Sequence, residues 1–210
     1  SSDLMSGGTI KGNYAYGNTG KEGSYVRCGG GIFIQGGTGT NTYDGTVYQA
    51  GVCIITGGTI TGNYAYGNGS GVCAGNKTVT YSTGHLGSIT DSREVNGPAG
   101  LFVGGNAVVK GNVIRGTSNE ESIYLSDGCE IGIIKELEDG AELSVTMEDV
   151  SEDAILARYE DGVAMSADDA ERFSITDGRY FALVEDEGVI KAVKPDLAVV
   201  AELTVLEKEV

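Results

Sequence analysis

The acidic and basic side chains that could carry acid–base chemistry gather in one short segment, residues 91–94. Asp91, Arg93 and Glu94 lie within four positions of each other there. Two carboxylates at a suitable separation can act as acid and base on a glycosidic bond. Residues 1–120 hold only six acidic side chains in all, whereas a hydrolytic groove gathers several on one face. Solvated turn charges are therefore the favoured interpretation, and catalysis is the alternative.

Histidine and cysteine offer little further chemistry. The one histidine, His85, follows Gly84, and a general base also needs an orienting acid and a substrate beside it. A surface histidine is favoured. The four cysteines fit no Cys-x-x-Cys metal pair, and buried thiols without an assigned disulfide are the favoured interpretation. These cysteines are Cys28, Cys53, Cys73 and Cys129. We expect no catalytic residue, no metal and no cofactor.

Tyrosines give the strongest signal for a binding surface. Eight of the 11 tyrosines lie in residues 1–120. Tyr14 matches Tyr64, and Tyr16 matches Tyr66, at a spacing of 50 residues. If these positions are neighbours in space, aromatic rings line one edge in columns. Such rings suit sugar stacking, but contact between the rings themselves, about 0.5–1.5 kcal/mol per pair, is the interpretation ranked first. The candidate ligand-binding residues are Tyr14, Tyr16, Tyr64, Tyr66, Asp91, Arg93 and Glu94.

Composition excludes several classes of protein. The chain has 210 residues, 35 glycines, 2 prolines and a net charge of −16. Glycine without a period of three and scarce proline exclude collagen. The negative charge argues against nucleic acid and against anionic membrane surfaces. No apolar run is long enough to span a membrane.

Charge and glycine content divide the chain near residue 120. Residues 1–120 hold 29 of the 35 glycines and carry a net charge of +1, whereas residues 121–210 carry −17. The acidic runs of the second half could supply oxygen ligands to calcium. They match neither the spacing of an EF-hand nor a Gly-Gly-x-Gly-x-Asp repeat. A solubilising acidic surface is favoured.

The first half contains an internal repeat. Residues 6–18 return as residues 56–68 with eleven of thirteen positions identical, and residues 87–91 look like a weaker third copy. Both strong copies contain a Gly-Asn pair, at Gly12-Asn13 and at Gly62-Asn63. Glycine and asparagine tolerate the left-handed backbone of a sharp corner. Asparagines at equivalent corners are expected to hydrogen-bond in a ladder.

Two further short units recur around the main repeat. They are rich in β-branched residues, are bounded by glycine and show no helical periodicity, so they predict short strands. One unit occurs at residues 31–34, 71–74 and 100–103, and the other at residues 4–6, 54–56 and 80–82. Three strand units in a fixed order predict a coil with three faces. Stacked coils of this kind form an all-β fold, the parallel β-helix.

The second half predicts a small β-rich module. The strands are expected at residues 131–134, 142–146, 180–184 and 189–193. Ser166 is a suitable N-cap for a helical turn over residues 167–172. The end of a β-helix has unpaired strand edges that must be covered. We therefore expect three parts: repeats over residues 1–122, a cap over residues 123–194, and a linker or further module over residues 195–210.

The repeat resembles a known family. The motif Ser-Gly-Gly-Thr-Ile-x-Gly-Asn is similar to the repeats of adhesin-like and pectate-lyase-like right-handed β-helix surface proteins of gut Firmicutes. The segments 122–128 and 167–173 resemble a strand and a short helix that follow such repeats, so the resemblance covers residues 3–194. It implies a right-handed helix of about three irregular coils, a secreted or bacterial cell-surface location, and a longer polypeptide. The members of such families that cleave polysaccharides use acidic residues, and some use an arginine as the base, in a groove on the side of the helix.

The expected function is that of a non-enzymatic, adhesin-like repeat module that displays a glycan- or protein-binding face. Weak contacts on such a rigid display add through multivalency. The expected partners are a host or plant-wall glycan or a surface protein, without nucleic acid and without membrane insertion. A polysaccharide lyase or glycoside hydrolase of the β-helix type is one alternative. A purely structural spacer is the other.

Overall fold

Strands dominate the chain in the computed structural model, which describes residues 2–15, 29–34, 39–40, 47–48, 50–75, 81–82, 90–91, 100–185 and 188–195. The helical element of these residues is one 3₁₀ helix, η1 (Ala167–Arg172). The all-β expectation is confirmed. Within the described ranges, no helix has the length and apolar character needed to cross a membrane.

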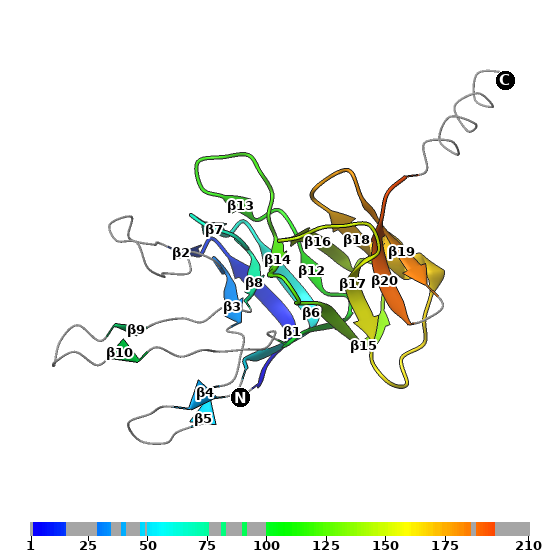
Figure 1. The fold of residues 1–210 in the computed structure, drawn as a ribbon, viewed down its shortest axis with the longest axis horizontal. Coiled ribbons are helices and arrows are strands. Elements are labelled where there is room, and N and C mark those ends of the chain that lie inside the picture. The colour runs from blue at the N-terminus through cyan, green and yellow to red at the C-terminus, as the bar shows by residue number, and fades with distance from the viewer. Residues whose placement is uncertain are drawn as a thin grey trace.

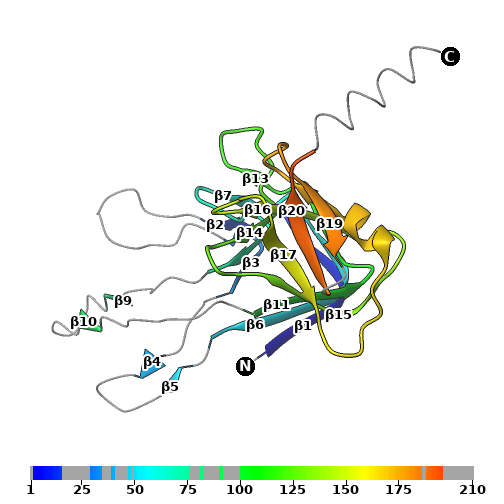
Figure 2. The same cartoon turned by 45° about the vertical axis from the view of Figure 1, so that its right-hand side comes forward.

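A first stack of strands lies side by side along the length of the molecule (Figures 1 and 2). Parallel pairing joins β1 to β6, β6 to β11 and to β12, β11 to β15, and β15 to β17. Its members are β1 (Ser2–Lys11), β6 (Val52–Thr61), β11 (Gly100–Gly105), β12 (Val108–Val109), β15 (Ile131–Leu137) and β17 (Ala154–Tyr159).

Two further stacks follow the first in chain order. The second is a separate parallel sheet of three very short strands: β2 (Tyr14–Ala15), β7 (Tyr64–Ala65) and β13 (Val113–Ile114). The third is also parallel and comprises β3 (Ile32–Ile34), β8 (Val72–Ala74), β14 (Ile123–Leu125), β16 (Glu142–Met147) and β18 (Phe173–Ile175).

We call one strand group from each pass of the chain a rung. The first rung is β1, β2 and β3; the second is β6, β7 and β8; the third is β11 with β12, β13 and β14. In the pass after the third rung, β16 pairs with both β12 and β14. The single strand β16 therefore lies beside two separate strands of the third rung. It connects the first and third stacks into one sheet of thirteen strands.

The far end of this sheet is antiparallel. The strands β19 (Phe181–Glu185) and β20 (Val189–Val193) form a hairpin, and β20 pairs antiparallel with β17. The large sheet is therefore mixed. Figure 1 places this hairpin at the opposite end of the molecule from β1, β2 and β3. The predicted strands and the helical turn of the second half are confirmed, and Ser166 caps η1 as expected.

The apolar core runs between the stacks. Burial alternates along β6, which is typical of a strand with one face inward. Residues in register on neighbouring strands then form buried columns. These columns arise because the strands pair in parallel, as the repeat predicted. The columns include Cys53, Leu101 and Ile131, and beside them Ile55, Val103 and Ile133.

The structure corrects the third copies that the sequence suggested. The strand β9 (Tyr81–Ser82) pairs antiparallel with β10 (Thr90–Asp91) rather than parallel with the rungs. The remaining residues of the two suggested copies, 80 and 87–89, lie outside the described residues. Residues 100–103 lie in β11 against β6 rather than beside β8, whose neighbours are β3 and β14. The third rung lies at residues 100–125. A second antiparallel pair, β4 (Gly39–Thr40) with β5 (Val47–Tyr48), lies between β3 and β6 in the chain.

The division at residue 122 stays a prediction. Strand pairing continues across it, because β14 lies between β8 and β16 in one parallel stack.

Candidate functional site

A ladder of asparagines shapes the corner between the first and second stacks. The Asn13 side-chain amide donates to Asn63 Oδ1 at 3.1 Å, and the Asn63 amide donates to Asn112 Oδ1 at 2.9 Å. Asn112 in turn donates to Ser122 Oγ at 3.2 Å. The predicted ladder is confirmed, and its third member, Asn112, was not foreseen. It holds three successive corners in register.

Glycine makes each of these corners possible. Gly12, Gly62 and Gly111 precede the three asparagines and have φ angles of 71°, 61° and 67°. These left-handed angles carry little cost for glycine and a real cost for residues with a Cβ atom. The next strands, β2, β7 and β13, therefore begin at the same place in each rung.

The tyrosines predicted to form a column do so in part. Tyr14 lies directly opposite Tyr64, and Ala15 lies opposite Ala65. Ala65 is fully buried, so the alternation of a strand turns Tyr14 and Tyr64 outward, where they are 38% and 42% exposed. The third rung has Val113 opposite Tyr64. The column is thus two rings followed by an aliphatic side chain.

A second set of contacts joins Tyr14 to Tyr66 and Arg115, which follow the second and third strands of this stack. The Tyr66 ring lies 5.7 Å from the Tyr14 ring at an interplanar angle of 63°, an edge-to-face contact. The Arg115 guanidinium lies 4.8 Å from the Tyr14 ring centroid and 4.9 Å from the Tyr66 ring centroid. Arg115 Nη1 also donates to the Tyr14 hydroxyl. Cation–π attraction and this hydrogen bond hold the three side chains together.

Tyr14, Tyr64 and Arg115 border an open hollow of about 430 Å³ on the second stack. We call it the aromatic hollow; its lining residues are Tyr14, Tyr64, Val113, Arg115, Gly116 and Thr117. The lining combines ring faces, an aliphatic side chain and a cation, and it contains no carboxylate. A surface of this kind can bind a pyranose, whose C–H face packs on a ring while its hydroxyls take hydrogen bonds.

The segment that completes the hollow, residues 110–122, is fixed by two neighbouring carboxylates. Glu120 accepts from the Gly111 N–H at 2.7 Å and from Ser122 Oγ at 2.8 Å. Glu121 is buried and accepts from the Gly69 N–H at 2.6 Å. Burial raises the pKa of Glu121, and the bond from Gly69 lowers it by less. The Glu120 bonds therefore close the Arg115 loop, and the Glu121 bond ties it to the second rung.

The structure brings together three of the residues predicted to bind ligand: Tyr14, Tyr64 and Tyr66. Tyr16, Arg93 and Glu94 lie outside the described residues, as does His85.

Asp91 is described only through its backbone, which pairs with Tyr81 in the β9–β10 hairpin. Nothing in the described ranges therefore tests the acid–base cluster of residues 91–94.

Sequence reasoning missed Arg115. Part of its signal was present, because Gly111-Asn112 is one of the seven Gly-Asn pairs of the chain. Counting from that asparagine, Arg115 takes the place that Tyr66 takes after Asn63. The third repeat was not recognised because the residues between its glycines differ from those of the first two.

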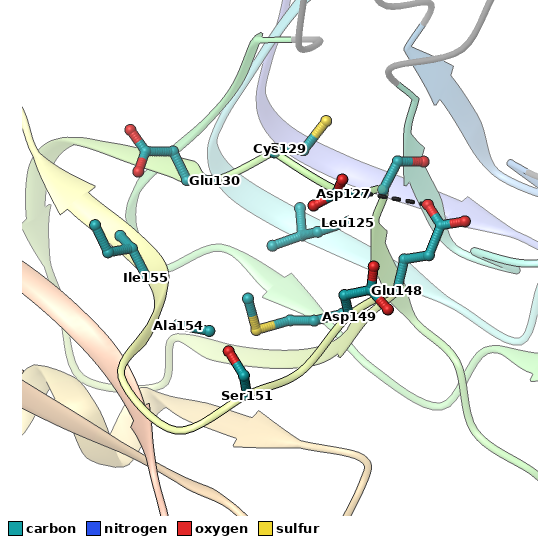
Figure 3. A pocket seen from close by; sticks show the side chains of 12 residues that line it. Leu125, Asp127, Cys129, Glu130, Glu148, Asp149, Ser151, Ala154 and Ile155 are labelled. Atoms are coloured by element: carbon teal, nitrogen blue, oxygen red, sulfur yellow. Dashed lines mark hydrogen bonds between the residues drawn. The ribbon is translucent and has the colours of Figure 1, made fainter.

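A second hollow, of about 360 Å³, lies among the turns that follow β14 and β16. Figure 3 shows acidic side chains at its rim, and the Asp127 N–H donates to Glu148 Oε2 at 3.1 Å. We call it the acidic hollow; its ionisable lining residues are Asp127, Cys129, Glu130, Glu148 and Asp149. Within the described residues, no three histidine, cysteine or acidic side chains are arranged to hold a metal ion.

The described cysteines behave as core residues. Cys53, Cys73 and Cys129 are buried and free of disulfides, whereas Cys28 lies outside the described residues. Burial, aided by the negative charge of Asp3, raises the pKa of the Cys53 thiol to about 11. Such a thiol is protonated and unreactive at neutral pH.

Comparisons with known proteins find no matching family model, no matching curated protein and no matching solved structure.

Proposed function

We propose that this chain is a carbohydrate-binding, adhesin-like module without catalytic activity, and that its glycan ligand binds in the aromatic hollow. One observation carries the proposal: two exposed tyrosine rings on neighbouring parallel strands, and an arginine directly after the third strand, lie at the edge of one open hollow. Exposed aromatic rings on a rigid scaffold bind sugars with little loss of conformational entropy.

The scaffold that we propose is a parallel β-helix, right-handed as the resemblance implies. Its support is the recurrence of three strands in the same order in each of three rungs, with parallel pairing between rungs. In this arrangement the hollow faces sideways from the stack. The proposal includes a secreted or cell-surface location, since display of a glycan site serves attachment there.

The Tyr64 ring supplies the main sugar platform in this proposal. It is the most exposed of the three described tyrosines of the cluster, and its hydroxyl makes no hydrogen bond to the described residues. Tyr14 has its hydroxyl engaged by Arg115 and its ring against Tyr66, so its role is to hold the platform's edge. The Ala65 backbone below Tyr64 is fixed by the bond from the Arg115 N–H at 2.8 Å.

The test is a glycan array of plant-wall and mucin glycans, probed with the wild-type chain and with Tyr64→Ala. Truncation of Tyr64 to alanine removes the ring on which the sugar packs. We therefore expect the variant to bind at least tenfold more weakly at unchanged thermal stability. Glu136→Ala, an exposed change on the other half of the chain, serves as the control.

Three other results would contradict the proposal. A blank array would favour the structural spacer, as would a Tyr64→Ala variant that loses stability alone. Cleaved glycan, found when bound spots are eluted and weighed by mass spectrometry, would favour the lyase or hydrolase.

A further inference from the structure

Arg115 differs from the other arginines of the described residues. Each of the other three pairs with a carboxylate: Arg158 with Glu130, Arg172 with Asp139, and Arg179 with Asp177. Among the described residues, no carboxylate lies within ion-pair distance of Arg115. Because the chain has 30 acidic residues against 14 basic ones, an arginine that has no carboxylate partner among the described residues is unusual.

The guanidinium of Arg115 is held in place before any ligand arrives. Two tyrosine rings contact it, at 4.8 and 4.9 Å, and one of its five N–H groups donates to the Tyr14 hydroxyl. A planar guanidinium fixed in this way keeps donors for a bidentate contact with a carboxylate. Because its rotamers are already restricted, it loses less entropy when a ligand binds.

The charge around Arg115 also favours an anion. The lining of the aromatic hollow contains no acidic side chain, and residues 1–120 carry a net charge of +1. The excess acid belongs to residues 121–210, and at physiological salt its field decays over about 8 Å.

We infer that the glycan ligand carries carboxylate groups, with one carboxylate on Arg115 and a pyranose face on Tyr64. This inference rests on the proposed glycan binding and specifies its substrate class: uronic acid or sialic acid sugars rather than neutral ones. Charge-assisted bidentate contacts discriminate between the acid and its neutral form by about tenfold to a hundredfold.

The test is isothermal titration calorimetry with two matched pairs of probes. One pair is a uronic acid oligosaccharide and its methyl ester, and the other is sialyllactose and lactose. We expect the wild-type chain to bind at least one acidic probe about tenfold or more tighter than its neutral counterpart, with an affinity that falls as salt increases.

Three variants place this preference on Arg115. Arg115→Gln is expected to bind the acidic and the neutral probe of each pair with equal affinity. Arg115→Lys keeps the charge but loses the planar fork, so an intermediate preference is expected. Arg179→Gln, which removes a paired arginine on the other half of the chain, leaves the preference unchanged. The wild-type comparison needs no variant, so it holds even if Arg115→Gln unfolds.

Equal binding of the acid and neutral probes by the wild-type chain would overturn the inference and leave glycan binding intact. Binding to neutral array glycans without binding to any acidic probe would do the same. An array without any bound glycan would overturn both proposals.

Discussion

The first and second rungs have nearly the same sequence and very different surroundings. Ile60 is fully buried in β6, whereas Ile10, fifty residues earlier, is half-buried in β1. Asn63 is fully buried at its corner, and Asn13 is exposed. The second rung has strands on both sides, and the described residues cover the first rung on one side only. Position in the stack, rather than sequence, therefore decides which copy of a residue stabilises the fold.

The largest difference is expected for the isoleucine pair. Ile60→Ala removes a fully buried side chain and leaves a cavity, which costs about 2–5 kcal/mol. Ile10→Ala removes a side chain that solvent already reaches, so it is expected to cost less than half as much. Urea unfolding of the two variants measures both values. Equal losses would show that the first rung is buried as deeply as the second.

The asparagine pair should differ next most. Asn63 donates through its side chain to the Ile10 and Thr61 carbonyls and to Asn112, and it also accepts from Asn13. Asn63→Ala leaves buried and partly buried groups without this partner, at about 1–3 kcal/mol. Asn13→Ala loses contacts that water replaces. Thermal unfolding should rank Asn63→Ala as clearly the weaker protein, and the reverse ranking would refute the ladder's role.

Gly7 and Gly57 form a matched pair, because both lie in strands and neither has a positive φ angle. A Cβ atom on Gly57 would lie 2.8 Å from the Ser6 carbonyl oxygen, whereas one on Gly7 meets nothing within 4 Å among the described atoms. Gly57→Ala is expected to cost about 1–2 kcal/mol through overpacking, and Gly7→Ala is expected to be close to neutral. Differential scanning calorimetry checks both. A neutral Gly57→Ala would mean that β1 does not lie against β6 as described.

The smallest effect concerns pH and the pair Glu120 and Glu121. Burial raises the folded-state pKa of Glu121 above its usual value of 4.5, so the folded state holds this proton more tightly than the unfolded state does. The stability that this proton contributes is fully present below about pH 4.5 and is lost as the pH rises through the folded-state pKa. Glu121→Gln should remove this loss, while Glu120→Gln, at an exposed position, should retain it.

Urea unfolding at a series of pH values between 4 and 8 compares these two variants with the wild-type chain. If Glu121→Gln shows the same decline in stability with pH as Glu120→Gln, the burial of the Glu121 carboxylate is not what sets its pKa.

Sequence reasoning predicted the contacts between the first two rungs because the repeat is nearly exact. The offset of 50 residues places Tyr14 opposite Tyr64 and Ile10 opposite Ile60, as the structure has them. The Gly-Asn corners followed from the backbone angles that these residues tolerate. The resulting asparagine ladder was also predictable, because equivalent corners of stacked strands must lie one above the other.

The third rung could not be predicted in the same way. Its corner keeps Gly111-Asn112, but Val113 and Arg115 replace the two tyrosines, so too few identities remain for this segment to stand out as a copy. Strands need only apolar residues on the inward face, and many sequences meet that need. The strands β17 and β18 were missed for the same reason. Arg115, the residue on which the ligand class depends, therefore emerged only from the fold.

The central claim, that the aromatic hollow binds a glycan, is tested most directly by nuclear magnetic resonance. The ¹⁵N-labelled chain is titrated with a glycan selected on the array, and backbone shift changes are mapped onto the structure. The account predicts saturable changes at Ala65, Ile114, Arg115, Gly116 and Thr117, which are absent in Tyr64→Ala. Changes confined to the acidic hollow, around Asp127 and Glu148, would contradict it.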